Sequence, residues 1–293
     1  MRKFISRIVL FLVLMGIIYA ITAFGFSRLE QRAKGENGRL IYIHDQLVAD
    51  SIIMGSSRAL HHYVPALLGN YYNVGEDRMG ILFNYARLLL LKQRHMPKMI
   101  IYDVEPDYDL LADDNSAYLA SLRPYYHRPG IQEIFWDVDS TERVKMLFPF
   151  YPYNSRLLKL LADCQHPSLC YDRGFSPYEG CDEIIPEKLP QDKHDLLKYR
   201  YLHKFIDLCK QNHTRLIFTA SPQLSYKSDS VYQTFKAICR EENIPFLNHF
   251  CDSRYTRHRE FFHNANHLNQ EGASIYSKEI RKEINNKRDN ATL

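Results

Sequence analysis

The residue types best suited to chemistry stand at two distant places in the chain, Ser57 and His267. Ser57 follows a short apolar run that ends in Gly55, and a helix-compatible segment comes next. This order places the hydroxyl where main-chain N–H groups have no helical partner. A hydroxyl held there can attack a carbonyl carbon while the helix N-terminus stabilises the oxyanion. Ser56 and Ser57 also suit a plain helix cap, because serine is a preferred N-cap residue.

His267 lies in the loop 261–269, before the final predicted helix. A neutral imidazole can accept the proton of Ser57 and return it to a leaving group. Asn264, three residues earlier, is placed to hold the other ring nitrogen. His267 also suits a loop residue near the helix start, with Asn269 as the N-cap. The histidine by itself leaves both interpretations open.

Strand and helix patterns alternate from residue 49 onward. The apolar runs predict strands over 52–54, 71–75, 98–104, 215–220 and 245–248, and helical spacing predicts helices over 80–94, 192–212, 230–242 and 270–284. Such repetition favours a mostly parallel sheet covered on both faces. Binding sites in these sheets form beyond the carboxyl ends of the strands. The residues that directly follow strands should therefore share one rim: Ser57, Gly75, Glu105 and Ser221.

The N-terminus predicts a membrane anchor. The segment from Ile8 to Phe26 has no charged residue, and at 1.5 Å per residue it spans about 28 Å, close to the hydrocarbon thickness. Basic residues precede it, which favours a cytoplasmic N-terminus, although further basic residues between 28 and 39 weaken the asymmetry. A cleaved signal peptide is the alternative, but the apolar run is long for one and no small-x-small site follows it.

These features predict a cytoplasmic stub over 1–7, a signal anchor over 8–26, a linker over 27–48 and an extracytoplasmic (periplasmic) domain over 49–289. Residues 108–190 interrupt the alternation with Tyr- and Pro-rich sequence and predict an insertion over the sheet edge, either a substrate lid or a structural cap. A short helix is expected over 154–162.

Composition restricts the class of protein. The chain has 293 residues, 45% of them hydrophobic and 25% charged, as in a globular protein. Its net charge of +4 is not gathered in a basic stripe, which argues against nucleic-acid binding. Three of the six cysteines crowd one stretch where a disulfide can staple a loop: Cys164, Cys170 and Cys181. Cys209 and Cys239 fall in helical patterns and are expected to be buried.

The motifs and their order resemble the SGNH/GDSL hydrolase superfamily. Gly55-Ser56-Ser57 follows the first strand, Asn73-Val74-Gly75 the second, and His267-Leu268-Asn269 precedes the last helix. Gly-Ser-Ser-Arg-Ala-x-His-His-Tyr, Pro-Lys-x-Ile-Ile-Tyr-Asp and His-Leu-Asn-x-x-Gly-Ala look like motifs of membrane-anchored SGNH-like proteins of Bacteroidetes-type bacteria, and more distantly of the D-alanyl transfer protein of teichoic acid synthesis. The match covers roughly 49–107 and 192–286. It implies a flavodoxin-like three-layer α/β/α sandwich.

The resemblance implies Ser57 as nucleophile, His267 as base, and the main-chain N–H groups of Ser57 and Gly75 in an oxyanion hole. Two departures from the family pattern follow. Asn264 replaces the acid three residues before the histidine, so the imidazolium charge is not offset. The oxyanion-hole asparagine expected after the third strand is absent, and carboxylates stand there instead: Asp103, Glu105 and Asp107. Asn73 or Arg58 is the candidate substitute; Arg58 also suits a clamp for an anionic substrate group or an ion pair with an acid such as Glu76 or Asp77.

Two functions of different class remain open. One is an extracytoplasmic serine esterase or O-acyltransferase acting on an acylated envelope glycan or polysaccharide, with a membrane acyltransferase as a partner and no metal or organic cofactor. The other is a catalytically weakened SGNH-like protein for glycan binding or assembly. Metal hydrolysis by His263 and His267 is a third interpretation, which a helix through both residues would favour. His61 and His62 suit the rim, the core or a cap.

Overall fold

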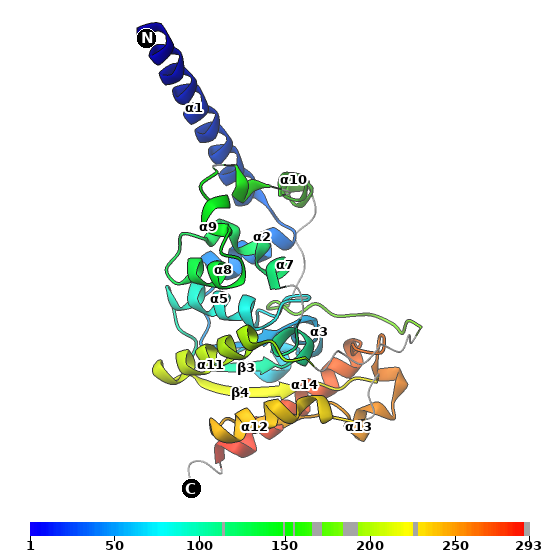
Figure 1. Cartoon of the computed structure of the whole chain (residues 1–293). Coiled ribbons are helices and arrows are strands. Elements are labelled where there is room, and N and C mark those ends of the chain that lie inside the picture. The colour runs from blue at the N-terminus through cyan, green and yellow to red at the C-terminus, as the bar shows by residue number, and fades with distance from the viewer. Residues whose placement is uncertain are drawn as a thin grey trace. The chain divides into compact units, whose positions relative to one another are not determined.

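Figure 1 shows a computed structural model of the chain, which describes residues 1–112, 115–148, 150–154, 156–165, 172–183, 193–224 and 228–289. The chain divides into two compact units. The smaller unit comprises Met1–Leu47 and Asp139–Cys170, and the larger comprises Val48–Val138 and Tyr171–Leu293.

The larger unit is built on a sheet of five parallel strands in the order β2-β1-β3-β4-β5. The strands are β1 (Ser51–Gly55), β2 (Tyr72–Asn73), β3 (Met99–Asp103), β4 (Arg215–Ala220) and β5 (Phe246–Asn248). This is the strand order of flavodoxin-like doubly wound sheets. The predicted parallel sheet is confirmed, and with it the flavodoxin-like α/β sandwich implied by the resemblance to SGNH/GDSL hydrolases.

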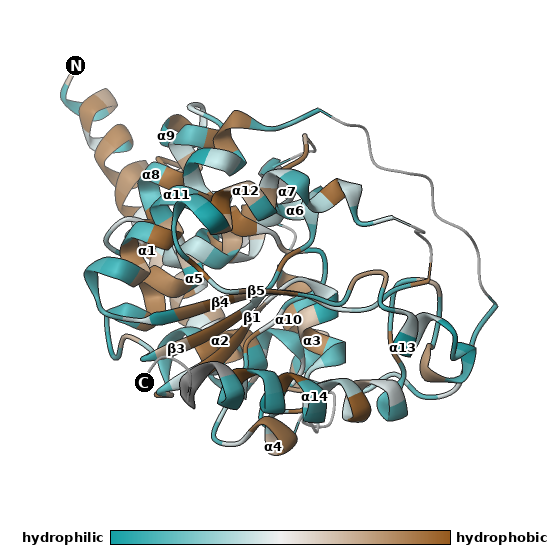
Figure 2. Cartoon of the chain, turned by 90° about the horizontal axis from the view of Figure 1, so that it is seen from below, coloured by the Kyte–Doolittle hydropathy of each residue, from teal (hydrophilic) through white to brown (hydrophobic). Residues whose placement is uncertain are grey.

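Helices cover both faces of the sheet (Figure 2). Ile53 and Ile101 share a buried cluster with Tyr276 of α14 on one face. On the other face Tyr102 packs edge-on against Phe205 of α11, with ring centroids 5.3 Å apart. Because both faces are covered, every residue of β3 is buried.

The four predicted helices of the larger unit correspond to α5, α11, η3 with α12, and α14, and several short helices lie between them. In chain order, the helices described in this unit are α3 (Ser57–His62), α4 (Pro65–Leu68), α5 (Ile81–Lys92), α6 (Pro106–Asp109), α7 (Asn115–Leu119), η1 (Ala120–Tyr125), α8 (Ile131–Val138), α11 (Leu196–Gln211), η3 (Ser230–Tyr232), α12 (Gln233–Glu241), α13 (Ser253–Thr256), η4 (Arg259–Phe261) and α14 (Gln270–Asp289). Asp195 caps α11, since its side chain accepts the main-chain N–H groups of Leu197 and Lys198.

Gly55 makes the turn from β1 into α3 possible. Its φ of 138° lies in the region that favours glycine, and a Cβ there would stand 2.5 Å from the main-chain oxygen of Asp103. Only a residue without a side chain lets β1 end this close to β3 and turn directly into Ser56 and Ser57.

The predicted insertion over 108–190 is not one body. Helices α7, η1 and α8 belong to the larger unit, where the apolar side chains Ile131, Ile134 and Phe135 of α8 are buried. Residues 139–170 group with the N-terminal helices instead. Within this range, residues 113–114, 149, 155, 166–171 and 184–190 lie outside the described residues.

The smaller unit contains α1 (Arg2–Arg32), α2 (Glu36–Asp45), α9 (Glu142–Lys145), η2 (Tyr151–Tyr153) and α10 (Leu157–Gln165). Helix α1 includes the predicted anchor. An 18-residue window of it has a mean hydropathy of 2.6, and the helix is long and apolar enough to cross a membrane. Polar contacts join α1 and α2 to the α10 segment. Arg156, directly before α10, pairs with Glu30 of α1 at 2.9 Å, and Asp163 of α10 accepts both the main-chain and the side-chain N–H of Asn37 in α2.

Cys209 and Cys239 are buried as predicted. Cys164 and Cys181 are free thiols, and Cys170 lies outside the described residues, so the structure pairs no cysteine that it describes.

Candidate active site

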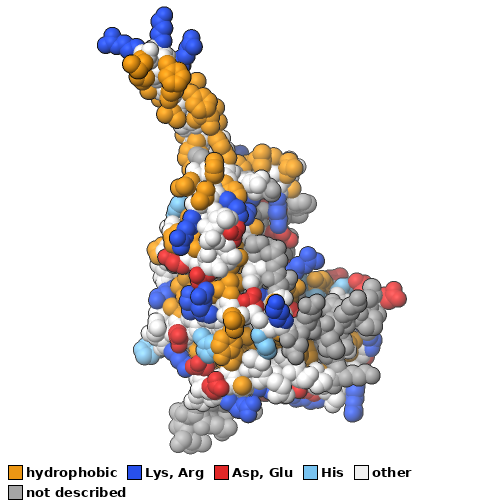
Figure 3. Space-filling model, viewed as in Figure 1, with side chains coloured by type: hydrophobic (Ala, Val, Ile, Leu, Met, Phe, Trp, Pro, Cys, Tyr) orange, Lys and Arg blue, Asp and Glu red, His pale blue; other side chains and the backbone are white. Residues whose placement is uncertain are grey.

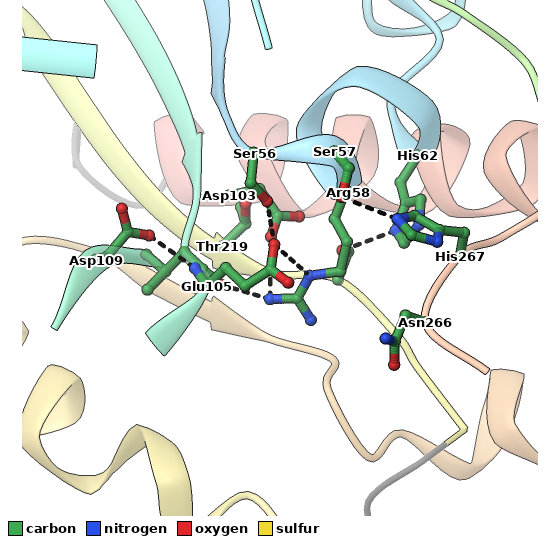
Figure 4. Close-up of polar contacts among 12 residues, drawn as sticks. Ser56, Ser57, Arg58, His62, Asp103, Glu105, Asp109, Thr219, Asn266 and His267 are labelled. Carbon is green, nitrogen blue, oxygen red and sulfur yellow. Dashed lines mark hydrogen bonds and ion pairs between the residues drawn. The ribbon is translucent and has the colours of Figure 1, made fainter. Parts of the chain in front are cut away.

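The structure brings Ser57 and His267 together at the carboxyl rim of the sheet (Figure 4). Ser57 is the first residue of α3, and His267 comes from the loop before α14. Ser57 Oγ lies 2.9 Å from His267 Nε2 across 210 residues of chain. Both side chains are half-buried. This is hydrogen-bond distance, as a nucleophile and its base require.

Asn264 fixes the tautomer of His267. Its Oδ1 accepts the main-chain N–H groups of Asn266 and His267, each at 3.0 Å, which identifies this atom as the oxygen. The same oxygen lies 3.1 Å from His267 Nδ1. Since an amide oxygen only accepts, Nδ1 carries the proton and Nε2 directs its lone pair at the Ser57 hydroxyl. The imidazole is thus oriented as a base.

The surroundings of His267 disfavour its charged form. Burial lowers the pKa of His267 to about 3, and His61 and the guanidinium of Arg58 act in the same direction. The ring is therefore neutral at pH 7 and ready to accept a proton. The imidazolium formed on proton transfer meets an amide at Nδ1, which cannot offset its charge.

His62 connects α3 to the loop that carries His267. Its Nε2 accepts the main-chain N–H of Leu268 at 3.0 Å, and its Nδ1 lies 2.8 Å from Ser221 Oγ. The first contact requires a bare Nε2, so Nδ1–H donates to Ser221 and the ring is neutral. Burial lowers the pKa of His62 well below its ordinary value, in agreement with this tautomer. His62 thus holds the residue next to His267 against the end of β4.

Arg58 lies beneath the site, with 3% of its surface exposed. One guanidinium nitrogen donates to Val104 O at 2.7 Å and to Tyr232 Oη at 2.9 Å. The guanidinium also lies 3.6 Å from Glu105 and 3.8 Å from Asp103. Figure 4 shows it turned toward Glu105 and away from His267. The geometry therefore gives Arg58 the ion-pair role, and neither the oxyanion role nor the substrate clamp.

The carboxylates after β3 are likewise engaged. Ser56 Oγ donates to Glu105, and Tyr63 Oη donates to Asp103. Burial raises the pKa of Asp103 to about 6, against the opposing effect of Arg58. The guanidinium of Arg58 therefore offsets part of the negative charge of Asp103 and Glu105.

Asn73 and Gly75 differ from their predicted role. The Asn73 amide nitrogen donates to the main-chain oxygens of Ala59 at 2.7 Å and Tyr63 at 3.2 Å, and its Oδ1 accepts the Gly75 N–H at 2.9 Å. These contacts join β2 to α3 and use the donors expected to face an oxyanion. The main-chain N–H of Ser57, in the first turn of α3, is the donor that this geometry leaves to that role.

Part of the predicted insertion lies beside the pair. The strap, residues 172–183, places the Tyr178 ring between His61 and His263, with centroid distances of 4.0 and 4.5 Å, and 5.3 Å from His267. The strap is held by His61 Nδ1, 2.6 Å from Ser176 O, and by His263 Nδ1, 3.0 Å from Glu179 O.

His263 and His267 do not share a helix face, because the chain between them is irregular. His263 Nε2 instead faces Asp182 at 3.2 Å. Among the residues that the structure describes, no group of three or more His, Cys, Asp or Glu side chains is arranged to hold a metal ion.

Sequence reasoning did not assign Tyr178 a role or choose among those open to His62. The sequence shows only that His62 follows Ser57 near the start of the predicted helix. That position fits a rim, a core or a capping role equally well. Tyr178 stood in a Tyr- and Pro-rich stretch that offered no spacing to single it out.

No protein-family model matches the chain, and no curated protein matches it. Solved structures similar to it include the following two. One is described as a candidate acylhydrolase from Bacteroides fragilis, with 12% identity, a TM-score of 0.44, and coverage of 85% of this chain and 96% of that one. The other is described as a candidate lipolytic protein of the G-D-S-L family from Desulfitobacterium hafniense, with 13% identity, a TM-score of 0.38, and coverage of 80% and 98%. Both are likenesses of fold.

Proposed function

We propose that the chain is a membrane-anchored, extracytoplasmic serine esterase or O-acyltransferase that acts on an O-acyl group of an envelope glycan. The observation that carries the proposal is the 2.9 Å contact between Ser57 Oγ and the unprotonated Nε2 of His267. The glycan and the envelope location come from the resemblance of the motifs and from the apolar α1.

The geometry supports an acyl-enzyme route. Ser57 Oγ attacks the acyl carbonyl carbon while its proton moves to His267 Nε2. The imidazolium then gives that proton to the leaving sugar oxygen as the ester bond breaks, which leaves an acylated Ser57. Water, or the hydroxyl of an acceptor, attacks this ester, and His267 again takes and returns the proton. Water gives hydrolysis and an acceptor hydroxyl gives transfer.

Asn264 favours a second candidate, a glycan-binding or assembly protein that has lost most turnover. An amide at Nδ1 leaves the imidazolium uncompensated. In a serine protease the exchange of the corresponding carboxylate for an amide lowers kcat by about 10⁴, where the amide also imposes the wrong histidine tautomer; Asn264 gives the correct tautomer and lacks only the charge. The two functions differ in whether Ser57 reacts at all.

A fluorophosphonate probe tests the proposal. We expect the wild type and Ser56→Ala to be labelled and Ser57→Ala to be unlabelled, because Ser56 is the neighbouring serine whose hydroxyl is bound to Glu105. Hydrolysis of p-nitrophenyl acetate should fall at least about a hundredfold in Ser57→Ala and His267→Ala, with unchanged thermal unfolding. Equal labelling of Ser57→Ala would refute the assignment, and an unlabelled wild type would favour the binding protein.

A further inference from the structure

The smaller unit exposes large apolar side chains outside α1. Leu147, Phe148 and Leu158 are 77%, 64% and 80% exposed, and Val144 and Leu157 are also exposed. We refer to these five residues, from α9, α10 and the chain between them, as the apolar collar. Side chains of this size seldom lie exposed together unless the surface meets a membrane or a partner.

The collar lies against α1. A groove of about 560 Å³ is lined by Thr22 and Phe26 of α1 and by Phe148, Phe150 and Leu157. The rings of Tyr19 and Phe150 meet edge-on at 6.1 Å. Figure 3 shows hydrophobic side chains along α1 and again over α10 at its base. The collar therefore continues the apolar surface of the helix expected to cross the bilayer.

Charged residues at both ends fix how deeply α1 sits in the bilayer. Arg7 precedes the uncharged run and Arg28 follows it, so the run of about 20 residues has the length of the hydrocarbon layer and cannot slide without burying a charge. Tyr19 stands seven residues before Phe26, about 10 Å below it along the axis. Side chains that pack on α1 between these two residues consequently lie at the level of the outer leaflet.

The segment that carries the collar also suits the outer leaflet, where polar main-chain groups and charges need partners within the protein. Its main chain runs largely through helical turns, in α9, η2 and α10, whose polar groups bond internally. Two lysines next to collar residues reach acids of the same unit: Lys145 lies 2.6 Å from Asp139, and Lys159 lies 2.6 Å from Glu36. Apolar side chains beside lysines with long stems are typical of segments that lie in a membrane interface.

We propose that the apolar collar is immersed in the outer leaflet, so that phospholipid acyl chains fill the groove against α1. The smaller unit then binds the bilayer through a spanning helix and a half-embedded collar. This inference rests on the membrane anchoring in the proposed function and not on the chemistry of Ser57.

Tryptophan fluorescence tests the proposal, because the chain contains a single tryptophan, Trp136. In a Trp136→Phe background, the collar variants Leu147→Trp and Leu158→Trp are compared with Leu196→Trp, a control at a leucine that is 83% exposed in the larger unit. The full-length proteins are reconstituted into phosphatidylcholine vesicles that contain lipids brominated near the headgroup end of their chains.

Brominated lipid should reduce the emission of both collar variants at least about twofold, while aqueous iodide quenches only the Leu196→Trp control. If iodide quenches the collar variants although the protein resists extraction by alkaline carbonate, the collar is not immersed in the membrane. The collar would then be a surface for a protein partner. Protein extracted by carbonate would overturn both the immersion and the anchoring. The same quenching in a Ser57→Ala background would separate this result from any failure of the proposed chemistry.

Discussion

Asn264 determines how much chemistry the Ser57–His267 pair can sustain. Its oxygen orients the ring 3.1 Å from Nδ1 and gives the correct tautomer. Orientation and charge compensation are separate contributions, and an amide supplies only the first. The pair is therefore arranged as a base and a nucleophile in the resting state, but is poorly stabilised once the proton has moved.

Asn264→Asp should raise turnover of p-nitrophenyl acetate at least about tenfold, because a carboxylate at the same place stabilises the imidazolium. The pKa of His267, lowered by burial to about 3, should rise at the same time. The acid limb of the kcat/KM profile then moves to higher pH, whereas the wild-type profile stays flat through about pH 5.

Asn266→Asp is the control, since it adds the same charge two residues away without the contact to Nδ1. An unchanged rate together with an unshifted acid limb in Asn264→Asp would show that a different group orients His267.

His62→Ala should weaken both folding and catalysis. It removes the partners of a buried main-chain N–H at Leu268 and of Ser221 Oγ, which costs about 1–3 kcal/mol in the free energy of unfolding. Because the loop next to His267 loses its support, kcat should fall about tenfold. His62→Gln keeps an acceptor near the place of Nε2 and should recover part of both losses.

The pH dependence of stability identifies the buried neutral ring. The pKa of His62 lies well below the ordinary 6.5 in the folded chain, so the unfolded chain binds the extra proton. The stabilisation is complete above pH 6.5 and is lost as pH falls below it. The advantage of the wild type over His62→Gln in chemical denaturation should thus shrink below pH 6.5 by up to about 1.4 kcal/mol per pH unit. A constant difference would mean that His62 is not buried as the neutral form.

Among the elements, the strap depends on one glycine. Gly174 has a φ of 87°, and a Cβ there would lie 1.9 Å from Asn73 O. Gly174→Ala should displace the strap and with it Tyr178, so KM should rise several-fold and the free energy of unfolding should fall by more than about 2 kcal/mol.

Gly180→Ala is the matched control for the strap. Gly180 also has a positive φ, 69°, but an added Cβ meets nothing within 4 Å. Gly180→Ala should therefore lower the free energy of unfolding only by the backbone strain, about 1 kcal/mol. Equal effects of the two variants on KM would show that the strap does not position Tyr178 at the site.

The elements that the sequence predicts well are those whose residues are set by local pattern. Apolar runs bounded by breaking residues predict β1 and β3, and parallel strands share a rim, so Ser57 and His267 were expected to meet. The contacts of His62 and Asn73 were not predictable, because they depend on which side of α3 packs against β2 and the loop before α14. The division of residues 108–190 between two units also depends on tertiary packing, which no local spacing in that Tyr- and Pro-rich stretch reveals.

At the scale of the whole molecule, the cysteines test the extracytoplasmic location that we propose for the larger unit. Cys181 is exposed, whereas Cys209 and Cys239 are buried and burial raises the pKa of each to about 12. A membrane-impermeant maleimide should therefore label the wild type on intact cells, and Cys181→Ser should lose one label per chain. Labelling of Cys181 only after permeabilisation would place the larger unit in the cytoplasm.

The separation of 210 positions between Ser57 and His267 also sets the order of events during synthesis. A ribosome synthesises the serine long before the histidine, and α14, which packs on α3, follows the histidine in the chain. A chain exported from its amino end therefore stays inert while it is being translocated. On the proposed function, reactivity begins only when nearly the whole polypeptide has been exported, and a protein truncated before residue 267 lacks the base and should be inactive.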